Sequence, residues 1–194
     1  MQHLMFIQKM HAALDEAGYT AKDWEIRSLQ AVGSTNNRVA DMLGLYQKVI
    51  VLSEIQTQGR GRERREWFSP VGGLWMSIGF LTDAEPHELS GPIIQVIQEE
   101  LSKYVECEVK DPNDILINGL KVCGILVETK IQSNRLKQVI IGIGINVTNE
   151  IPEEIETIAT SLAEHRDELP SIQELGTQVS IRVLDKLRTF IPNL

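Results

Sequence analysis

Residues 114–145 contain the pattern that most restricts the fold of this chain: three strand-like segments joined by connections of a few residues. Residues 114–117 lead into Asn118-Gly119, the dipeptide that best fits a type I′ hairpin turn. Residues 122–130 run back, Ser133-Asn134 predicts another turn, and residues 136–145 form the third strand. Connections this short join antiparallel neighbours, so we expect a β-meander.

Helical and strand-like patterns flank this meander on both sides. Helices are expected at 1–17, 34–43, 90–104 and 171–190, and further strands at 49–55 and 74–81. The first helix is expected to bury the face that carries Leu4, Ile7, His11 and Leu14. The element order lacks the regular βαβ alternation of a dinucleotide-binding fold. We therefore expect one domain of the α+β class, with a mixed, mainly antiparallel sheet layered with helices.

Composition excludes several classes of protein. The chain has 19 Lys and Arg against 27 Asp and Glu, a formal charge of −8, which argues against a general nucleic-acid binder. The hydrophobic fraction of 42% suffices for a core, and no apolar run could span a membrane. The first residues lack a signal-peptide pattern, so we expect a cytoplasmic protein without membrane association. With two cysteines and four scattered histidines, we expect no metal site.

Residues 56–67 form a polar loop that is rich in glycine and arginine and ends at Trp67. Glycines let the backbone approach a ligand closely, and guanidinium groups match the geometry of phosphate and carboxylate. The loop is therefore a candidate anion site that Trp67 can cover. Its composition alone is equally consistent with a nucleic-acid-binding segment or a solvated loop.

Three further motifs can carry chemistry, and each has a plainer explanation. Residues 110–114 (Lys-Asp-Pro-Asn-Asp) also fit an ordinary turn. Lys121 can point its ammonium into a cleft or be a solvated hairpin residue. Residues 142–146 (Gly-Ile-Gly-Ile-Asn) lack the third glycine and the helix of a dinucleotide fingerprint, which favours a strand whose glycines permit close packing.

Together, and in this order, these motifs resemble the catalytic domain of biotin protein ligases. The matching segments are Ser-Thr-Asn at 34–36, Gly-Arg-Gly-Arg at 59–62 with Trp67, Lys-x-Pro-Asn-Asp at 110–114, Lys-x-x-Gly-Ile-Leu-x-Glu at 121–128 and Gly-x-Gly-x-Asn at 142–146. The resemblance extends over roughly residues 30–150. It implies the biotin/lipoyl ligase catalytic-domain fold.

The resemblance also implies an enzyme that activates biotin with ATP to biotinyl-5′-AMP and then transfers biotin to a lysine of a biotin carrier protein domain. Mg²⁺ would accompany the nucleotide. Two alternatives stay open: a lipoyl- or octanoyl-type acyl ligase, and a biotin-binding subunit that needs a partner for catalysis. A homodimer is also left open, since related enzymes often pair sheet edges.

Roles for individual residues follow from the same resemblance. Lys121 and Arg62 are the implied catalytic residues, with Lys121 holding carboxyl and phosphoryl oxygens. Ser34, Thr35 and Gln56 would contact the ureido head of biotin. The implied substrate-binding set is Ser34, Thr35, Asn36, Gln56, Gly59, Arg60, Gly61, Arg62, Trp67, Lys110, Asn113, Asp114, Lys121, Gly124, Leu126 and Asn146.

The sequence departs from the family pattern at two places. Asp111 replaces a tryptophan, which would weaken adenylate binding if its carboxylate faced the site. In the loop, Arg64 replaces a glycine and stiffens the lid, while Glu63 and Glu66 reduce its positive charge.

The expected domain organisation is a single catalytic domain over residues 1–194. Residues 151–194 would form an acidic segment, which we expect to be solvated surface, followed by a C-terminal helix. We expect neither an N-terminal DNA-binding domain nor a C-terminal β-barrel domain, and therefore no DNA binding.

Overall fold

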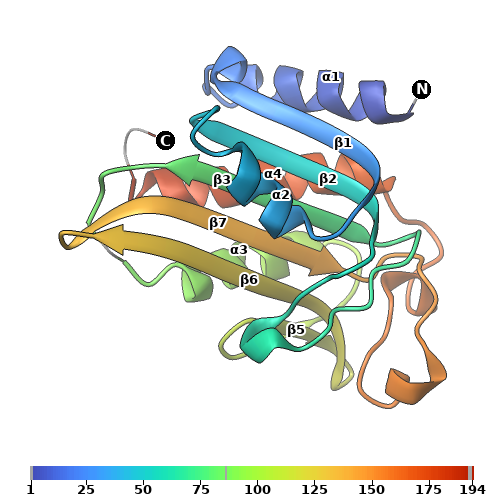
Figure 1. Ribbon diagram of the computed structural model, residues 1–194. Helices are drawn as coiled ribbons and strands as arrows, with labels where there is room; N and C mark the ends of the chain where they lie inside the picture. The colour runs from blue at the N-terminus through green and yellow to red at the C-terminus, as the bar shows by residue number, and fades with distance from the viewer. Residues whose placement is uncertain (1, 86, 192–193) are drawn as a thin grey trace.

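A computed structural model describes residues 2–85, 87–191 and 194 (Figure 1). Four α-helices in this part of the chain pack on one sheet: α1 (Gln2–Glu16), α2 (Thr35–Met42), α3 (Ser90–Leu101) and α4 (Ile172–Arg188). The strands are β1 (Trp24–Val32), β2 (Lys48–Gln56), β3 (Leu74–Leu81), β4 (Glu108–Lys110), β5 (Asp114–Ile117), β6 (Leu120–Gln132) and β7 (Arg135–Ile145).

The strands lie in the order β1-β2-β3-β7-β6-β5-β4. Only β1 and β2 pair in parallel, and every other neighbouring pair is antiparallel. The predicted α+β class with a mainly antiparallel sheet is thus confirmed. The two edge strands were not predicted, because β1 has no regular alternation of buried and exposed residues and β4 has only three residues.

The predicted meander is also confirmed. Asn118 and Gly119 have φ of 50° and 81°, and Ser133 and Asn134 have φ of 51° and 56°. Type I′ turns require positive φ at both central residues, so each dipeptide occupies the position that its chemistry favours. These two turns place β5, β6 and β7 side by side.

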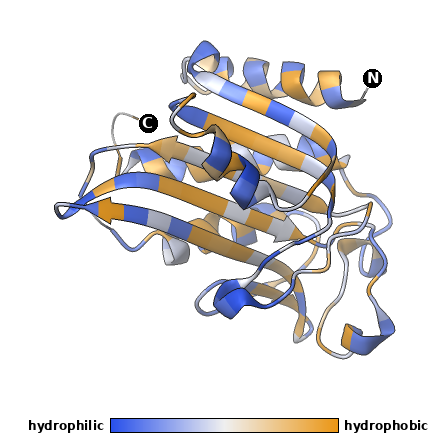
Figure 2. Ribbon diagram, in the orientation of Figure 1, coloured by the Kyte–Doolittle hydropathy of each residue, from blue (hydrophilic) through white to orange (hydrophobic). Residues whose placement is uncertain are grey.

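Strand alternation divides the sheet into two faces. On β7, Val139, Ile141, Ile143 and Ile145 belong to the main hydrophobic core, which includes residues of α1, α3 and α4. Figure 1 shows α2 on the opposite side of the sheet from α3 and α4, and Figure 2 shows the strands as largely apolar. A smaller apolar cluster joins α2 to the side chains of β2 and β7 that point the other way. This second face also carries the candidate site.

The helix at the N-terminus is confirmed, but its predicted core face is only partly right. Leu14 is fully buried as predicted, but Leu4 is 61% exposed and Ile7 and His11 are partly exposed. Phe6 and Met10, which were not predicted, are fully buried instead. Helical spacing fits both stripes, and packing against β1 and α4 decides between them. No helix in residues 2–85 or 87–191 is long and apolar enough to cross a membrane.

The last helix begins as the sequence predicts. Ser171 and Glu174 form a capping box, in which the Ser171 hydroxyl accepts from the Glu174 N–H and the Glu174 carboxylate accepts from the Ser171 N–H. Oε1 of Glu174 also lies 3.2 Å from Nζ of Lys9 in α1. The helix ends at Arg188, two residues before the predicted end.

Candidate active site

A cavity of about 480 Å³ opens on the same face of the sheet as α2, next to the N-terminus of that helix. Its walls are the N-terminus of α2, the loop that precedes β3, the β5–β6 hairpin and a segment that follows β7. A volume of this size suits a small organic ligand. Every residue of the predicted substrate-binding set lines this cavity except Gly59.

Gly59 shapes the loop instead of lining the cavity. A Cβ atom at this position would lie 2.2 Å from the carbonyl oxygen of Trp67. The N–H of Trp67 donates to the carbonyl of Gly59 at 2.9 Å, and the N–H of Gly61 donates to Arg65 at 2.7 Å. The loop therefore closes on itself, and only glycine permits this approach at residue 59.

Glycines on β6 and β7 form the floor of the cavity. Gly124 and Gly144 are direct partners across the two strands. A Cβ at Gly144 would lie 2.6 Å from Nε1 of Trp67, and one at Gly124 would lie 3.1 Å from the same indole ring. Trp67 thus lies on a surface that the absence of side chains creates. The interpretation of residues 142–146 as a strand with close-packing glycines is confirmed.

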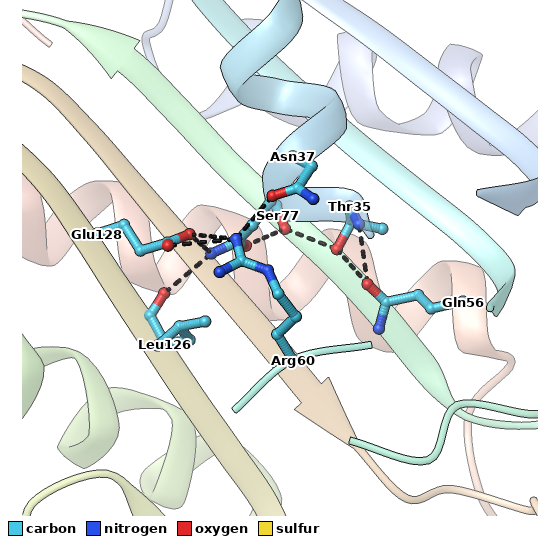
Figure 3. Close-up of polar contacts among 8 residues, drawn as sticks. Thr35, Asn37, Gln56, Arg60, Ser77, Leu126 and Glu128 are labelled. Carbon is cyan, nitrogen blue, oxygen red and sulfur yellow. Dashed lines mark hydrogen bonds and ion pairs between the residues drawn. The ribbon is translucent and has the colours of Figure 1, made fainter. Parts of the chain in front are cut away.

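Neutral polar side chains form a connected chain at one end of the cavity (Figure 3). The hydroxyl oxygen of buried Ser77 lies 2.7 Å from Oγ1 of Thr35 and 2.6 Å from Oδ1 of Asn36. The hydroxyl and N–H of Thr35 both donate to Oε1 of Gln56, whose amide in turn donates to Ser69. These bonds fix the orientation of each group before a ligand arrives.

Lys121 points into the cavity, which decides between the two interpretations left open by the sequence. Its Nζ lies 2.7 Å from Oδ1 of Asp114 and 4.9 Å from the centre of the Trp67 ring. Its backbone pairs with the segment after β7, since Lys121 N–H donates to Ile158 and Thr160 N–H donates to Lys121. The ammonium is therefore held within the cavity by an ion pair and a cation–π contact.

The two arginines of the Gly-Arg-Gly-Arg motif have different surroundings. Arg62 is exposed at the rim, where its Nη1 donates to Oδ1 of Asn113 at 3.2 Å. Arg60 instead pairs with Glu128 of β6. Lys110 lines the rim and is exposed. Asp111, which replaces the family tryptophan, is exposed and does not line the cavity.

The departure at residues 63–64 has a structural consequence. Glu63 and Arg64 have φ of 57° and 61°, in the left-handed region that favours glycine. Arg64 stands where the family pattern has a glycine. The loop keeps the glycine-like backbone and carries its strain.

The segment after β7 was missed as part of the site. Its acidic residues are exposed, as expected, but Ile151, Ile155 and Ile158 line the cavity. Asn146 holds this segment in place, because its Nδ2 donates to the carbonyl of Thr160 at 3.0 Å. The spacing of the three isoleucines among acidic residues is the signal that could have identified an apolar wall.

Candidate metal ligands do not cluster in the described ranges, where no group of three or more His, Cys, Asp or Glu side chains is close enough to hold an ion. Cys107 and Cys123 are free and buried, and burial raises the pKa of the Cys123 thiol. Burial likewise raises the pKa of the Cys107 thiol, and neither cysteine lines the cavity.

Comparisons with known proteins connect this site to one family. The model of the "Biotin/lipoate A/B protein ligase family" matches residues 29–146. The bifunctional ligase/repressor BirA of Bacillus subtilis is 40% identical over 126 residues, which cover 59% of this chain and 38% of that protein. The biotin–[acetyl-CoA-carboxylase] ligase of Mycobacterium tuberculosis is 31% identical over 158 residues, covering 70% of this chain and 55% of that protein.

Solved structures agree with these relatives. The biotin protein ligase of Aquifex aeolicus, in complex with biotin and ATP, superposes with a TM-score of 0.71 at 31% identity, covering 87% of this chain and 72% of that one. LipL1 of Plasmodium falciparum, in complex with lipoate, has a TM-score of 0.52 at 12% identity and shares the fold. The chain spans less than two thirds of the length of the two sequence relatives named above. Because the family model covers more than half of the chain, the protein belongs to the biotin/lipoate A/B protein ligase family.

Proposed function

We propose that this chain is the catalytic domain of a biotin protein ligase. It would activate biotin with ATP to biotinyl-5′-AMP and transfer biotin to a lysine of a carrier protein domain. The observation that carries the proposal is the arrangement of one cavity, in which Lys121 lies between a neutral polar end and an apolar wall. The names of the sequence relatives, and the structure that holds biotin and ATP, support it.

The neutral polar end suits the ureido ring of biotin. A ureido group is uncharged and has both N–H donors and a carbonyl acceptor. Thr35 and Gln56 offer hydroxyl and amide groups whose orientation is already fixed. A ligand that exchanges bonds with water for bonds to such preset groups loses little on binding.

The centre of the cavity suits the adenylation step. In that step the carboxylate oxygen of biotin attacks the α-phosphorus of ATP, and pyrophosphate leaves. Two anionic groups must approach each other, so a cation between them stabilises the developing charge. Lys121 would supply this cation, since it lines the cavity and its Nζ lies 2.7 Å from Oδ1 of Asp114. Arg62 at the rim is available to the phosphates.

The apolar wall and Trp67 suit the nucleotide and the stability of the adenylate. Ile151, Ile155 and Ile158 offer a surface for a flat base. Trp67 covers the glycine floor and would shield the mixed anhydride from water. The carrier lysine amine then attacks the acyl carbon of biotinyl-5′-AMP, and AMP leaves.

We further propose that Mg²⁺ enters with the phosphates of ATP, since Asp114 offers a carboxylate oxygen, the ligand type that Mg²⁺ prefers. The acyl acceptor would be a biotin carrier domain. Consumption of ATP and two free thiols are consistent with a reaction in the cytoplasm.

Biotin-dependent exchange between ATP and pyrophosphate tests this proposal. We expect exchange that requires biotin and falls at least about 100-fold in Lys121→Ala, the loss typical for a group that stabilises developing charge. The melting temperature of the variant should stay close to that of the parent, because Lys121 is part of the cavity wall and not of the core.

A thermal-shift assay distinguishes biotin from other acids. Biotin should protect the folded protein in a saturable manner, and lipoate should not. Protection by lipoate alone would favour the lipoyl-type ligase, and biotin protection without any exchange would favour a binding subunit that needs a partner.

A further inference from the structure

Glu128 lies on β6, four residues beyond the floor glycine Gly124 and on the same face of the sheet. Glu128 does not line the cavity. Its carboxylate accepts hydrogen bonds from two residues that do line it, Arg60 and Asn36. We propose that Glu128 is a positioning residue. It fastens the glycine-arginine loop to the sheet through Arg60, and it fixes the amide of Asn36. This inference rests on the proposed function, because the positioned groups are those that would receive biotin.

The guanidinium of Arg60 connects three separate parts of the chain (Figure 3). Its Nη2 lies 3.2 Å from each carboxylate oxygen of Glu128 and donates to Oδ1 of Asn37 at 2.7 Å. Arg60 belongs to the loop, Glu128 to β6 and Asn37 to α2. The charge of Arg60 is therefore already balanced, and among the motif arginines Arg62 is the one left for a phosphate.

The same carboxylate sets the orientation of Asn36. Nδ2 of Asn36 donates to Glu128 at 2.7 Å, while Oδ1 of Asn36 lies 2.6 Å from the hydroxyl oxygen of Ser77. Asn36 is 4% exposed, and its Oδ1 would lie 2.4 Å from a Cβ at Gly142, so the amide packs closely against the floor. Through Ser77 this orientation extends to Thr35 at the polar end of the cavity.

Solvent exposure indicates that this contact acts on position and contributes little to stability. The side chains of Arg60 and Glu128 are 36% and 38% exposed, and ion pairs at such sites contribute little to folding. The two ends of the loop have their own backbone bonds, from Gln58 to Gly33 and from Gln56 to Ser69. Breaking the pair should thus release the part of the loop near Arg60 without unfolding the protein.

Glu128→Gln tests the proposal, because it keeps the shape and replaces one acceptor oxygen by a donor amide. The released loop should be cut faster by trypsin in the absence of any substrate. In the exchange assay the KM for biotin should rise about tenfold with little change in kcat, the size expected for losing one charge-assisted hydrogen bond. In an Arg60→Ala background, Glu128→Gln should not speed trypsin cleavage further, since the loop is already released, whereas its effect through Asn36 should still raise the KM for biotin.

Two further variants accompany this test. Glu85→Gln removes another exposed ion pair, with Arg135 at the far end of β7, and should change neither trypsin cleavage nor KM. Asn37→Ala removes the second acceptor of Arg60 and should act like Glu128→Gln, but less strongly. If Glu128→Gln does not fold, Asn37→Ala still tests whether the contacts of Arg60 fasten the loop.

The proposal is overturned if trypsin cleavage and KM are unchanged in both Glu128→Gln and Asn37→Ala. A loss confined to kcat would also overturn it, because it would place the pair in the chemical step. If the parent protein catalyses no biotin-dependent exchange, the proposed function fails. The trypsin comparison then still decides whether Glu128 fastens the loop.

Discussion

The two faces of the sheet carry different residues on the same strands. On β7, the side chains of Ile141, Ile143 and Ile145 point into the core beneath the helices. Gly142 and Gly144 alternate with them and form part of the cavity floor. A core isoleucine contacts many neighbours, and another apolar side chain of similar volume can replace it at modest cost. Each cavity glycine is required by one contact, with Trp67 or with Asn36. Substitutions should therefore reduce stability on the core face and ligand binding on the cavity face.

The largest effect is expected on the core face. Leu187→Ala in α4 removes a fully buried side chain and should lower the free energy of unfolding by about 2–5 kcal/mol. Urea denaturation measures this loss. The KM for biotin of the folded fraction should not change, and a parallel rise in KM would show that the two faces are coupled.

Gly144→Ala should show the opposite pattern. The new Cβ would lie 2.6 Å from Nε1 of Trp67 and would force the indole off the floor. We expect about tenfold weaker binding of the adenylate, equivalent to about 1.4 kcal/mol, with only a small change in the unfolding midpoint. Calorimetry measures the affinity, and tryptophan fluorescence reports the displacement.

Ile141→Val is the matched control for Gly144→Ala, since it changes a buried residue of β7 on the core face that does not line the cavity. It should cost about 0.5–1.5 kcal/mol of stability and leave binding unchanged. Equal effects of the two variants on affinity would contradict the division between the faces.

Ser171→Ala tests the capping box of α4 on the core side. Loss of the cap should reduce stability by about 1 kcal/mol at neutral pH. The effect should depend on pH, because hydrogen bonds from Ser171 hold the pKa of Glu174 below its ordinary value of 4.5. A lowered folded-state pKa gives stabilisation that is full above pH 4.5 and is lost as pH falls through the folded pKa. The difference between parent and variant, followed by thermal unfolding from neutral to acid pH, should therefore shrink, and a constant difference would exclude this linkage.

The smallest effect is expected for Arg64→Gly in the loop. Glycine adopts the observed φ of 61° without strain, but it also gains freedom in the unfolded chain. We expect a net stabilisation of about 0.5 kcal/mol, visible as a slightly higher melting temperature. Destabilisation would show that the Arg64 side chain makes a contribution larger than the backbone strain.

Local patterns predicted most of the fold. The meander followed from its two turn dipeptides, and α4 followed from its capping box and apolar stripe. The strand that was not predicted, β1, and the helix whose buried face was only partly predicted, α1, pack on each other at one edge of the sheet. Periodicity alone leaves such edge elements ambiguous, because the partner that covers them decides which side chains are buried.

The motifs likewise predicted which residues line the cavity more fully than they predicted the contacts between those residues. Residues more than a hundred positions apart, from Ser34 to Asn146, line the same space. The isoleucine wall after β7 and the pairing of Arg60 with Glu128 were not predicted, since they depend on how distant segments meet.

The sequence by itself determined the turns, the strand and helix periods, the family and the residues that gather at the site, because these depend on neighbours along the chain or on motif spacing. Only the tertiary structure decided that Lys121 points inward, that Asp111 is exposed outside the cavity and that Arg60 is already paired. The physical reason is that a side chain's direction and partner depend on the sheet register. That register places Gly124 opposite Gly144 and brings the loop onto β6.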